Sequence, residues 1–131
     1  MNSVSAAWSK LAPDRKADAV DNNGQRYERE AEALLCGNGL SLLARNWSCR
    51  FGEIDLIMRD GSTLVFVEVR QRNSLRFGGA AASIGRDKRD RIERAIGLYL
   101  SRLPAMPACR VDAVLFDGSS QPQWLRNIFA S

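Results

Sequence analysis

The chain has 131 residues, which is enough for one domain with a hydrophobic core. Its 19 Lys and Arg residues outnumber its 15 Asp and Glu residues, and the net charge of +4 weakly favours an anionic partner. The absence of histidine excludes histidine bases, histidine metal ligands and the common catalytic triads. No apolar run is long enough to cross a membrane, and the N-terminus lacks the pattern of a signal peptide. We therefore expect a cytoplasmic protein without a membrane partner.

The first predicted element follows a polar stretch at the N-terminus. Residues 1–22 lack a sustained hydrophobic period, which is typical of a flexible tail, and we expect residues 23–131 to form a single domain. Over residues 24–36 the apolar positions recur at helical spacing, which predicts a helix. Glu28 borders the apolar face of this helix and, considered alone, is an ordinary surface acid.

Three strands are predicted next. Residues 40–47 form the first apolar run, and the runs 53–58 and 64–69 flank the turn signal Asp60-Gly61. An Asp-Gly pair between two such runs strongly indicates a β-hairpin. Short connections between three consecutive strands predict an antiparallel meander.

The second half of the chain contains a loop, a helix and two strands. The loop 73–83 includes Arg76, which could contact a nucleic-acid backbone or simply be solvated. A charged amphipathic helix is predicted over 87–102, a buried strand over 111–116 and a short edge strand over 124–129. This order of elements predicts an α/β fold with a central mixed sheet, made of the meander plus one or two further strands.

The three cysteines are Cys36, Cys49 and Cys109, which lie far apart in the sequence. An odd number without CxxC spacing argues against a disulfide framework and against a zinc site. We expect all three to be reduced and most of them to be buried.

Two acids interrupt the apolar runs of the predicted hairpin. Any even-numbered loop places Asp55 and Glu68 on the same face, because opposed residues share a face. A two-residue turn at Asp60-Gly61 sets Asp55 opposite Phe66, and a four-residue turn sets it opposite Glu68. Two carboxylates about 5 Å apart repel by about 3 kcal/mol at an effective dielectric of about 20. A bound cation, a shared proton or a neighbouring arginine would offset this repulsion.

These alternatives remain open from the hairpin residues alone. Carboxylate oxygens suit Mg²⁺ or Mn²⁺, which predicts a metal site. Arg70 or Arg72 could instead pair with Glu68 on a solvated face of the sheet. The two interpretations are about equally supported.

The hairpin strands, together with motifs in both predicted helices, resemble the YraN-like family of uncharacterised bacterial proteins in sequence and in order. The matching segments cover residues 23–129 and include GEIDLI at 52–57 and FVEVR at 66–70. Further matches are Gly24, Glu28, Ala31, Arg45, Asn46, Phe77, Gly78, Lys88, Arg91, Ile92, Ala95, Tyr99 and Leu100.

That family is similar to the PD-(D/E)xK nuclease-like proteins, and most closely to archaeal Holliday junction resolvases. The resemblance implies a restriction-endonuclease-like mixed sheet with helices on both sides. It assigns Asp55, Glu68 and the backbone carbonyl of Val69 as ligands of Mg²⁺ or Mn²⁺, and Glu28 would complete the cluster. Because resolvases need two sites, a homodimer is possible, although no residue marks an interface.

The resemblance has one departure with chemical consequences. Arg70 occupies the position of the superfamily's catalytic lysine, and arginine cannot lose its proton as a general base must. Arg70 can still orient a phosphate or stabilise developing charge. The motif also lacks the proline before Asp55, where Ile54 stands, and Tyr27 replaces the glycine before Glu28.

The expected function is a metal-dependent endonuclease acting on nucleic acid, above all DNA and including branched DNA. Asp55, Glu68 and Arg70 would be catalytic. Residues expected to contact phosphates are Arg72, Arg76, Lys88 and Arg91. The alternatives are a catalytically inactive nucleic-acid-binding module with a nuclease-like fold, and a protein-interaction domain whose acids are satisfied internally.

Overall fold

A computed structural model describes residues 23–71, 85–118 and 121–129. The elements are α2 (Asn23–Gly37), β1 (Ser41–Cys49), β2 (Gly52–Asp60), β3 (Thr63–Gln71), α3 (Arg86–Ser101), β4 (Cys109–Phe116) and β5 (Gln123–Leu125). The expected tail over 1–22, Arg72, and the predicted loop over 73–83 with Arg76 lie outside the described residues.

The five strands form one mixed sheet in the order β1-β2-β3-β4-β5. β1, β2 and β3 pair antiparallel as a meander, β4 runs parallel to β3, and β5 returns antiparallel to β4. The parallel pair needs a crossover connection, which includes α3. The predicted α/β fold with a meander plus two further strands is confirmed.

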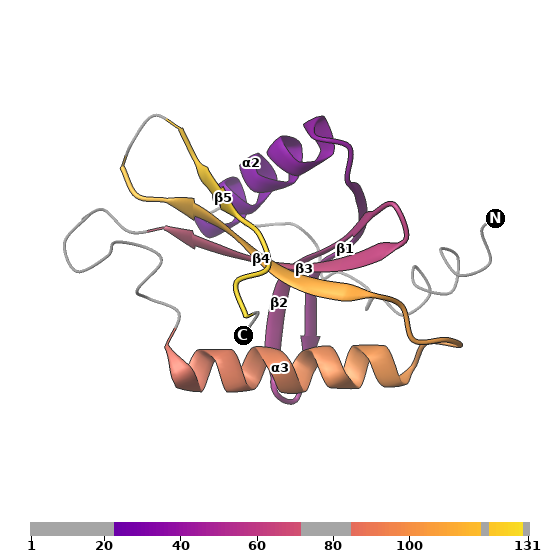
Figure 1. Ribbon diagram of the computed structural model, residues 1–131. Helices are drawn as coiled ribbons and strands as arrows, with labels where there is room; N and C mark the ends of the chain where they lie inside the picture. Colours follow the sequence, from indigo (N-terminus) through magenta and orange to yellow (C-terminus); the bar gives the residue numbers. More distant parts are fainter. Residues whose placement is uncertain (1–22, 72–84, 119–120, 130–131) are drawn as a thin grey trace.

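The two helices cover opposite faces of this sheet, as Figure 1 shows. On the α3 face, Tyr99 is fully buried and makes edge-to-face contacts with Trp47 and Phe66, with ring centroids 5.2 and 5.8 Å apart. On the α2 face, Ala31 and Leu35 are fully buried against the sheet. This three-layer arrangement agrees with the restriction-endonuclease-like fold that the resemblance implies.

The β2–β3 hairpin has the even loop that the sequence predicted, although its position differs. Asp60 pairs with Thr63, so the two loop residues are Gly61 and Ser62 rather than Asp60 and Gly61. Gly61 has φ +62°, a conformation that glycine adopts without strain. The last pair of this ladder is Leu56 with Val67. Continuing the register by one residue places Asp55 across from Glu68, which is one of the two predicted alignments.

The last strand is shorter than predicted, because it ends at Leu125 instead of Phe129. Asn127 has φ +57°, which is incompatible with an extended strand. Its backbone N–H donates a hydrogen bond to the Asp112 side chain at 2.9 Å. A buried acid on β4 therefore turns the chain away from the sheet edge, and no local sequence pattern contains that information.

The cysteines are free, as predicted, but the expectation that most would be buried is wrong. Cys36 and Cys109 are exposed and Cys49 is half-buried, because they lie near the ends of α2, β4 and β1. Within the described ranges, no helix combines the length and apolar character needed to span a membrane.

Candidate metal centre

Asp55 lies where β2 departs from regular alternation. Ile54 and Ile57 both pack in the core under α3, although residues three apart in a regular strand point to opposite faces. Just past the last pair of the β2–β3 ladder, the Asp55 side chain accepts a hydrogen bond from the backbone N–H of Val69 at 2.8 Å. The carboxylate is therefore fixed at the end of the ladder, beside the strand that carries Glu68.

Three carboxylates meet at this position. Oxygen atoms of Glu28, Glu53 and Asp55 all lie within 4.8 Å of one another. Glu28 comes from α2 and is half-buried, and Glu53 comes from β2 and is exposed. Glu28 was predicted here from the resemblance, whereas Glu53 was missed. Its position two residues before Asp55, which places both on one face of a regular strand, is the signal that could have identified it.

Glu68 is the buried acid of the centre, with only 1% of its surface exposed. Neither of its carboxylate oxygens has a hydrogen-bond partner within the part of the chain that the structure describes. The Lys88 ammonium on α3 lies 3.4 Å from Oε1, which is an ion-pair distance. Buried carboxylates in folded proteins are normally hydrogen-bonded, so these oxygens need an explanation.

Burial and neighbouring charges disfavour the ionised forms of Asp55 and Glu68. Burial raises the pKa of the Asp55 carboxyl well above its usual range, and the nearby charges of Glu68, Glu28 and Glu53 raise it further, against the lowering effect of the Val69 N–H. Burial also raises the pKa of Glu68, while the positive charges of Lys88 and Arg70 lower it. The centre therefore favours either extra protons or an added cation.

A cavity of about 280 Å³ opens onto Asp55 and Glu28, although neither Glu53 nor Glu68 is among the described residues that line it. Glu28 on α2 and Lys88 on α3 both line it, although the two helices cover opposite faces of the sheet. The cavity therefore lies where the end of the sheet is accessible from both layers. The described residues that line it are Gly24, Tyr27, Glu28, Asp55, Val69, Arg70, Gln71 and Lys88.

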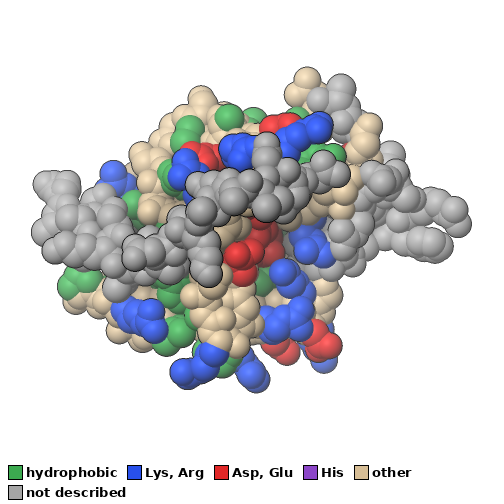
Figure 2. Space-filling view, turned by 180° about the vertical axis from the view of Figure 1, so that it is seen from behind, with side chains coloured by type: hydrophobic (Ala, Val, Ile, Leu, Met, Phe, Trp, Pro, Cys, Tyr) green, Lys and Arg blue, Asp and Glu red, His purple; other side chains and the backbone are tan. Residues whose placement is uncertain are grey.

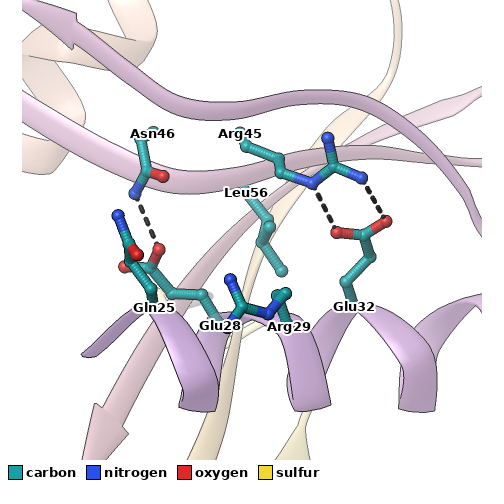
Figure 3. Close-up of a pocket in the computed structure, with 7 residues that line it drawn as sticks. All are labelled: Gln25, Glu28, Arg29, Glu32, Arg45, Asn46 and Leu56. Atoms are coloured by element: carbon teal, nitrogen blue, oxygen red, sulfur yellow. Dashed lines mark hydrogen bonds and ion pairs between the residues drawn. The ribbon is translucent and has the colours of Figure 1, made fainter. Parts of the chain in front are cut away.

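A second cavity of about 300 Å³ lies between α2 and β1 and shares Glu28 with the first. Figure 3 shows its lining residues, with the Asn46 amide directed at Glu28 and the Arg45 guanidinium directed at Glu32. Glu28 therefore lines both cavities, and Asn46 on β1 donates a hydrogen bond to it.

Comparison with known proteins places these residues in a family. The profile of the uncharacterised protein family UPF0102 matches residues 27–116, which include Glu28, Asp55, Glu68 and Lys88. The chain belongs to the UPF0102 family. This confirms the predicted YraN-like membership.

Several bacterial UPF0102 proteins are similar over most of their length. The one from Nitrosospira multiformis is 53% identical over 108 residues, covering 81% of this chain and 91% of the relative. One from Neisseria meningitidis is 48% identical over 107 residues, covering 80% and 92%. One from Nitrosomonas eutropha is 48% identical over 111 residues, covering 85% and 96%. The family description assigns no activity to UPF0102.

The other predicted site residues of this UPF0102 chain divide into three groups: those that line the first cavity, one outside its lining, and those outside the described residues. Arg70 and Val69 line the first cavity, but Val69 contributes its N–H to Asp55, and the role of its carbonyl stays a prediction. Lys88, predicted as a phosphate contact, pairs with Glu68. Arg91 is exposed on α3, outside the cavity lining. Arg72 and Arg76 lie outside the described residues.

The described lining of the first cavity carries both signs of charge, because Glu28 and Asp55 lie there together with Arg70 and Lys88. Figure 2 shows acidic side chains gathered near the middle of one face, with Lys and Arg side chains beside and below them. An anionic polymer would meet repulsion from the acids and attraction from the surrounding cations. Such a face suits a phosphate ligand best when the acidic charge is neutralised.

The donor set of the centre fits a hard divalent cation. Carboxylate oxygens are the ligands that Mg²⁺ and Mn²⁺ prefer, and the site offers those of Glu28, Glu53 and Asp55 within one small volume. The buried oxygens of Glu68, which have no hydrogen-bond partner in the described residues although the Lys88 ammonium lies 3.4 Å away, are a second and independent observation. No cysteine lines the cavity, and the chain has no histidine, so a zinc site is disfavoured.

Proposed function

We propose that this UPF0102 protein is a Mg²⁺- or Mn²⁺-dependent endonuclease that hydrolyses phosphodiester bonds in DNA, including branched DNA. The observation that carries the proposal is the Glu68 carboxylate, which is buried, has no hydrogen-bond partner within the described residues and lies 3.4 Å from the Lys88 ammonium. Its negative charge acts on Asp55. The restriction-endonuclease-like arrangement of sheet and helices supports it. So does the sequence resemblance to resolvases, because those enzymes hold their metal ions at the corresponding hairpin acids.

The balance of charge favours a cation at this position. Four carboxylates, those of Glu28, Glu53, Asp55 and Glu68, act on one another here. The cations that act on Glu68 are Lys88 and Arg70. Asp55, Glu68 and Glu28 would hold the metal, and Glu53 would add a ligand at the exposed side. The chemistry that a bound divalent cation supplies is a lowered pKa of its water and stabilisation of charge on phosphoryl oxygens.

The chain's own residues would position the substrate. Arg70 lines the cavity with Asp55, and a guanidinium can bind a phosphate through two parallel N–H groups. Lys88 lies at the same cavity and offers a second positive charge beside Glu68. Arg91 is exposed on α3 and would neutralise a phosphate further along the strand. These three cations would hold the nucleic acid across the acidic centre.

A second candidate function is a nucleic-acid-binding module without turnover. The observation that favours it is the ion pair between Lys88 and Glu68, which already places one positive charge on the buried acid. Arg70 at the lysine position points the same way, because it cannot act as a general base. This alternative predicts DNA binding that weakens with salt but is indifferent to a chelator.

The decisive experiment combines metal binding with cleavage. Mn²⁺ affinity is measured by titration calorimetry, and cleavage is followed on a four-way junction and on a linear duplex, each with and without EDTA. Asp55→Asn and Glu68→Gln remove one charge each from the centre. Asp60→Asn is the matched control, because Asp60 belongs to the same hairpin but pairs with Arg110.

The proposal expects wild type and Asp60→Asn to bind Mn²⁺ and to cleave DNA, and both centre variants to lose more than about a hundredfold in cleavage. Equal cleavage by all four proteins would disprove the assignment of the centre. Salt-dependent DNA binding without Mn²⁺ binding or cleavage would replace the endonuclease by the binding module.

A further inference from the structure

β1 departs from regular alternation at Asn46. Ala44 and Trp47, three residues apart, both lie in the core under α3, which a regular strand does not allow. Asn46 has φ +47°, in the left-handed region that residues other than glycine rarely adopt. Asparagine tolerates this region better than most residues, but strain of this kind persists only where the surroundings require it.

The departure from alternation brings two adjacent side chains to one helix. Asn46 Nδ2 donates a hydrogen bond to Glu28 Oε1 at 2.8 Å, and Arg45 donates to both Glu32 oxygens at 2.7 and 2.9 Å (Figure 3). Adjacent residues in a regular strand would point to opposite faces of the sheet. Glu28 and Glu32 lie four residues apart, so β1 holds α2 at two points one turn apart.

The two contacts differ in charge, and the difference matters for a metal site. The guanidinium of Arg45 neutralises Glu32, which is not one of the three clustered acids. The amide of Asn46 is uncharged and can only orient the carboxylate that it contacts. The Asn46 contact therefore fixes the direction of the Glu28 carboxylate without adding a positive charge to it.

We propose that Asn46 is a positioning residue of the cation site, whose amide holds the Glu28 carboxylate within the cluster formed with Glu53 and Asp55. Arg45 assists by fixing the same stretch of α2. The inference rests on the proposed function, because it presumes a cation at the centre. It gives the Arg45-Asn46 pair, which the sequence marked only as a matching motif, a physical role.

The test uses glycine at two asparagine positions. Asn46→Gly keeps a residue that adopts positive φ freely and removes only the side-chain amide. Asn127→Gly is the matched control, because Asn127 has φ +57° and its backbone N–H bond to Asp112 is retained. Mn²⁺ affinity, measured by titration calorimetry, should fall about tenfold or more in Asn46→Gly and stay unchanged in Asn127→Gly. The melting temperatures of both variants should equal or exceed that of wild type.

A double-mutant cycle shows whether Asn46 acts through Glu28. Glu28→Gln alone should weaken Mn²⁺ binding. In the Glu28→Gln background, Asn46→Gly should add no further loss, because the carboxylate that it positions is gone. If the fold losses in Mn²⁺ affinity caused by the two substitutions multiply in the double variant, Asn46 does not act through Glu28 and the positioning role is wrong.

Hydrogen exchange of the metal-free protein separates this inference from the proposed function. Amides of α2 around Glu28 should exchange faster in Asn46→Gly than in Asn127→Gly, whether or not a metal binds. If wild type binds Mn²⁺ and Asn46→Gly binds it equally well, the inference is wrong and the proposed function stands. If wild type binds no Mn²⁺, the proposed function and the cation role both fail. Equal exchange rates of the α2 amides in the two glycine variants would then also show that Asn46 does not hold α2 in place.

Discussion

Two buried acids on neighbouring strands have opposite surroundings. Asp112 on β4 is fully buried and accepts hydrogen bonds from the Arg110 guanidinium at 3.0 Å, the Trp124 indole at 3.0 Å and the Asn127 backbone at 2.9 Å. Glu68 on β3 is equally buried, and its oxygens have no such bond within the described residues. Since Asp112 pairs with Val67, the two acids lie only one step apart across the sheet.

The difference distinguishes an acid that stabilises the fold from one that can serve a ligand. The donors around Asp112 come from β4, β5 and the turn after β5. Its carboxylate therefore stabilises the β4–β5 edge of the sheet. Glu68 instead lies 3.4 Å from the ammonium of Lys88, a residue that lines the cavity. Fixed donors occupy the lone pairs of a carboxylate permanently, whereas a flexible lysine can be displaced or supplemented by a cation.

The largest predicted effect is the loss of stability caused by Asp112→Asn, measured in the presence of EDTA and compared with Glu68→Gln. Asp112→Asn turns two donors of the new amide towards existing donors and leaves Asp60 as the one carboxylate that still pairs with Arg110 in the described residues. We expect a loss of about 3 kcal/mol in the free energy of unfolding, measured by urea titration with circular dichroism.

Glu68→Gln is the matched change on the neighbouring strand. It removes a buried charge that has no hydrogen bond within the described residues, so we expect unfolding free energy to change by less than about 1 kcal/mol or to rise. Similar losses in both variants would abolish the contrast between the two acids.

The next effect is the stabilisation that a divalent cation provides. Ligand at about 100 times its dissociation constant adds about 2.7 kcal/mol to a protein that binds it only when folded. We expect Mn²⁺ to raise the melting temperature of wild type and of Asp60→Asn, and to leave Asp55→Asn and Glu68→Gln unchanged. A rise of the same size in all four proteins would mean that Mn²⁺ binds elsewhere.

The pH dependence of the metal-free protein follows from the raised pKa values of Asp55 and Glu68. Between the ordinary carboxyl range and the raised values, the folded protein holds protons that the unfolded chain has lost. The free energy of unfolding therefore falls as pH rises through that window, by about 1.4 kcal/mol per unit of pKa difference. Asp55→Asn should flatten this slope in urea titrations between about pH 4 and pH 8. A slope identical to that of wild type would show that other groups cause it.

Sequence periodicity was enough to predict most of the fold. The apolar repeats of residues 24–36 and 87–102 predicted α2 and α3, and the hairpin signal at Asp60-Gly61 predicted β2 and β3 to within a residue of their turn. These patterns are local, because each element must bury one face whatever its neighbours are. The predicted end of β5 was wrong. The hydrogen bonds to Asp112 that end this strand join residues up to 15 apart in the sequence.

The centre was predictable only in part. Asp55 and Glu68 were identified because acids interrupt buried runs, and Glu28 because of the resemblance. The left-handed backbone of Asn46 was not predictable, because such strain persists only where the surrounding structure requires it. The pairing of Lys88 with Glu68 was not predictable either, because the two residues lie 20 positions apart in the sequence. Charge alone assigned Lys88 to phosphate, since a basic residue on a helix surface gives no sign of an acid on a distant strand.

The smallest predicted effect concerns Lys88, and it distinguishes the endonuclease from the binding module. Lys88→Met leaves Glu68 without its nearest cation, but protonation of Glu68 limits the cost, so we expect a loss of about 1 kcal/mol at pH 8 and less at pH 5. If a metal binds the centre, saturating Mn²⁺ should remove the difference between Lys88→Met and the charge-preserving Lys88→Arg, because the added cation then stabilises Glu68. If Lys88 is the permanent counter-ion of an inactive module, Mn²⁺ should leave the difference intact. Urea titrations of the two variants at both pH values, with and without Mn²⁺, decide between them.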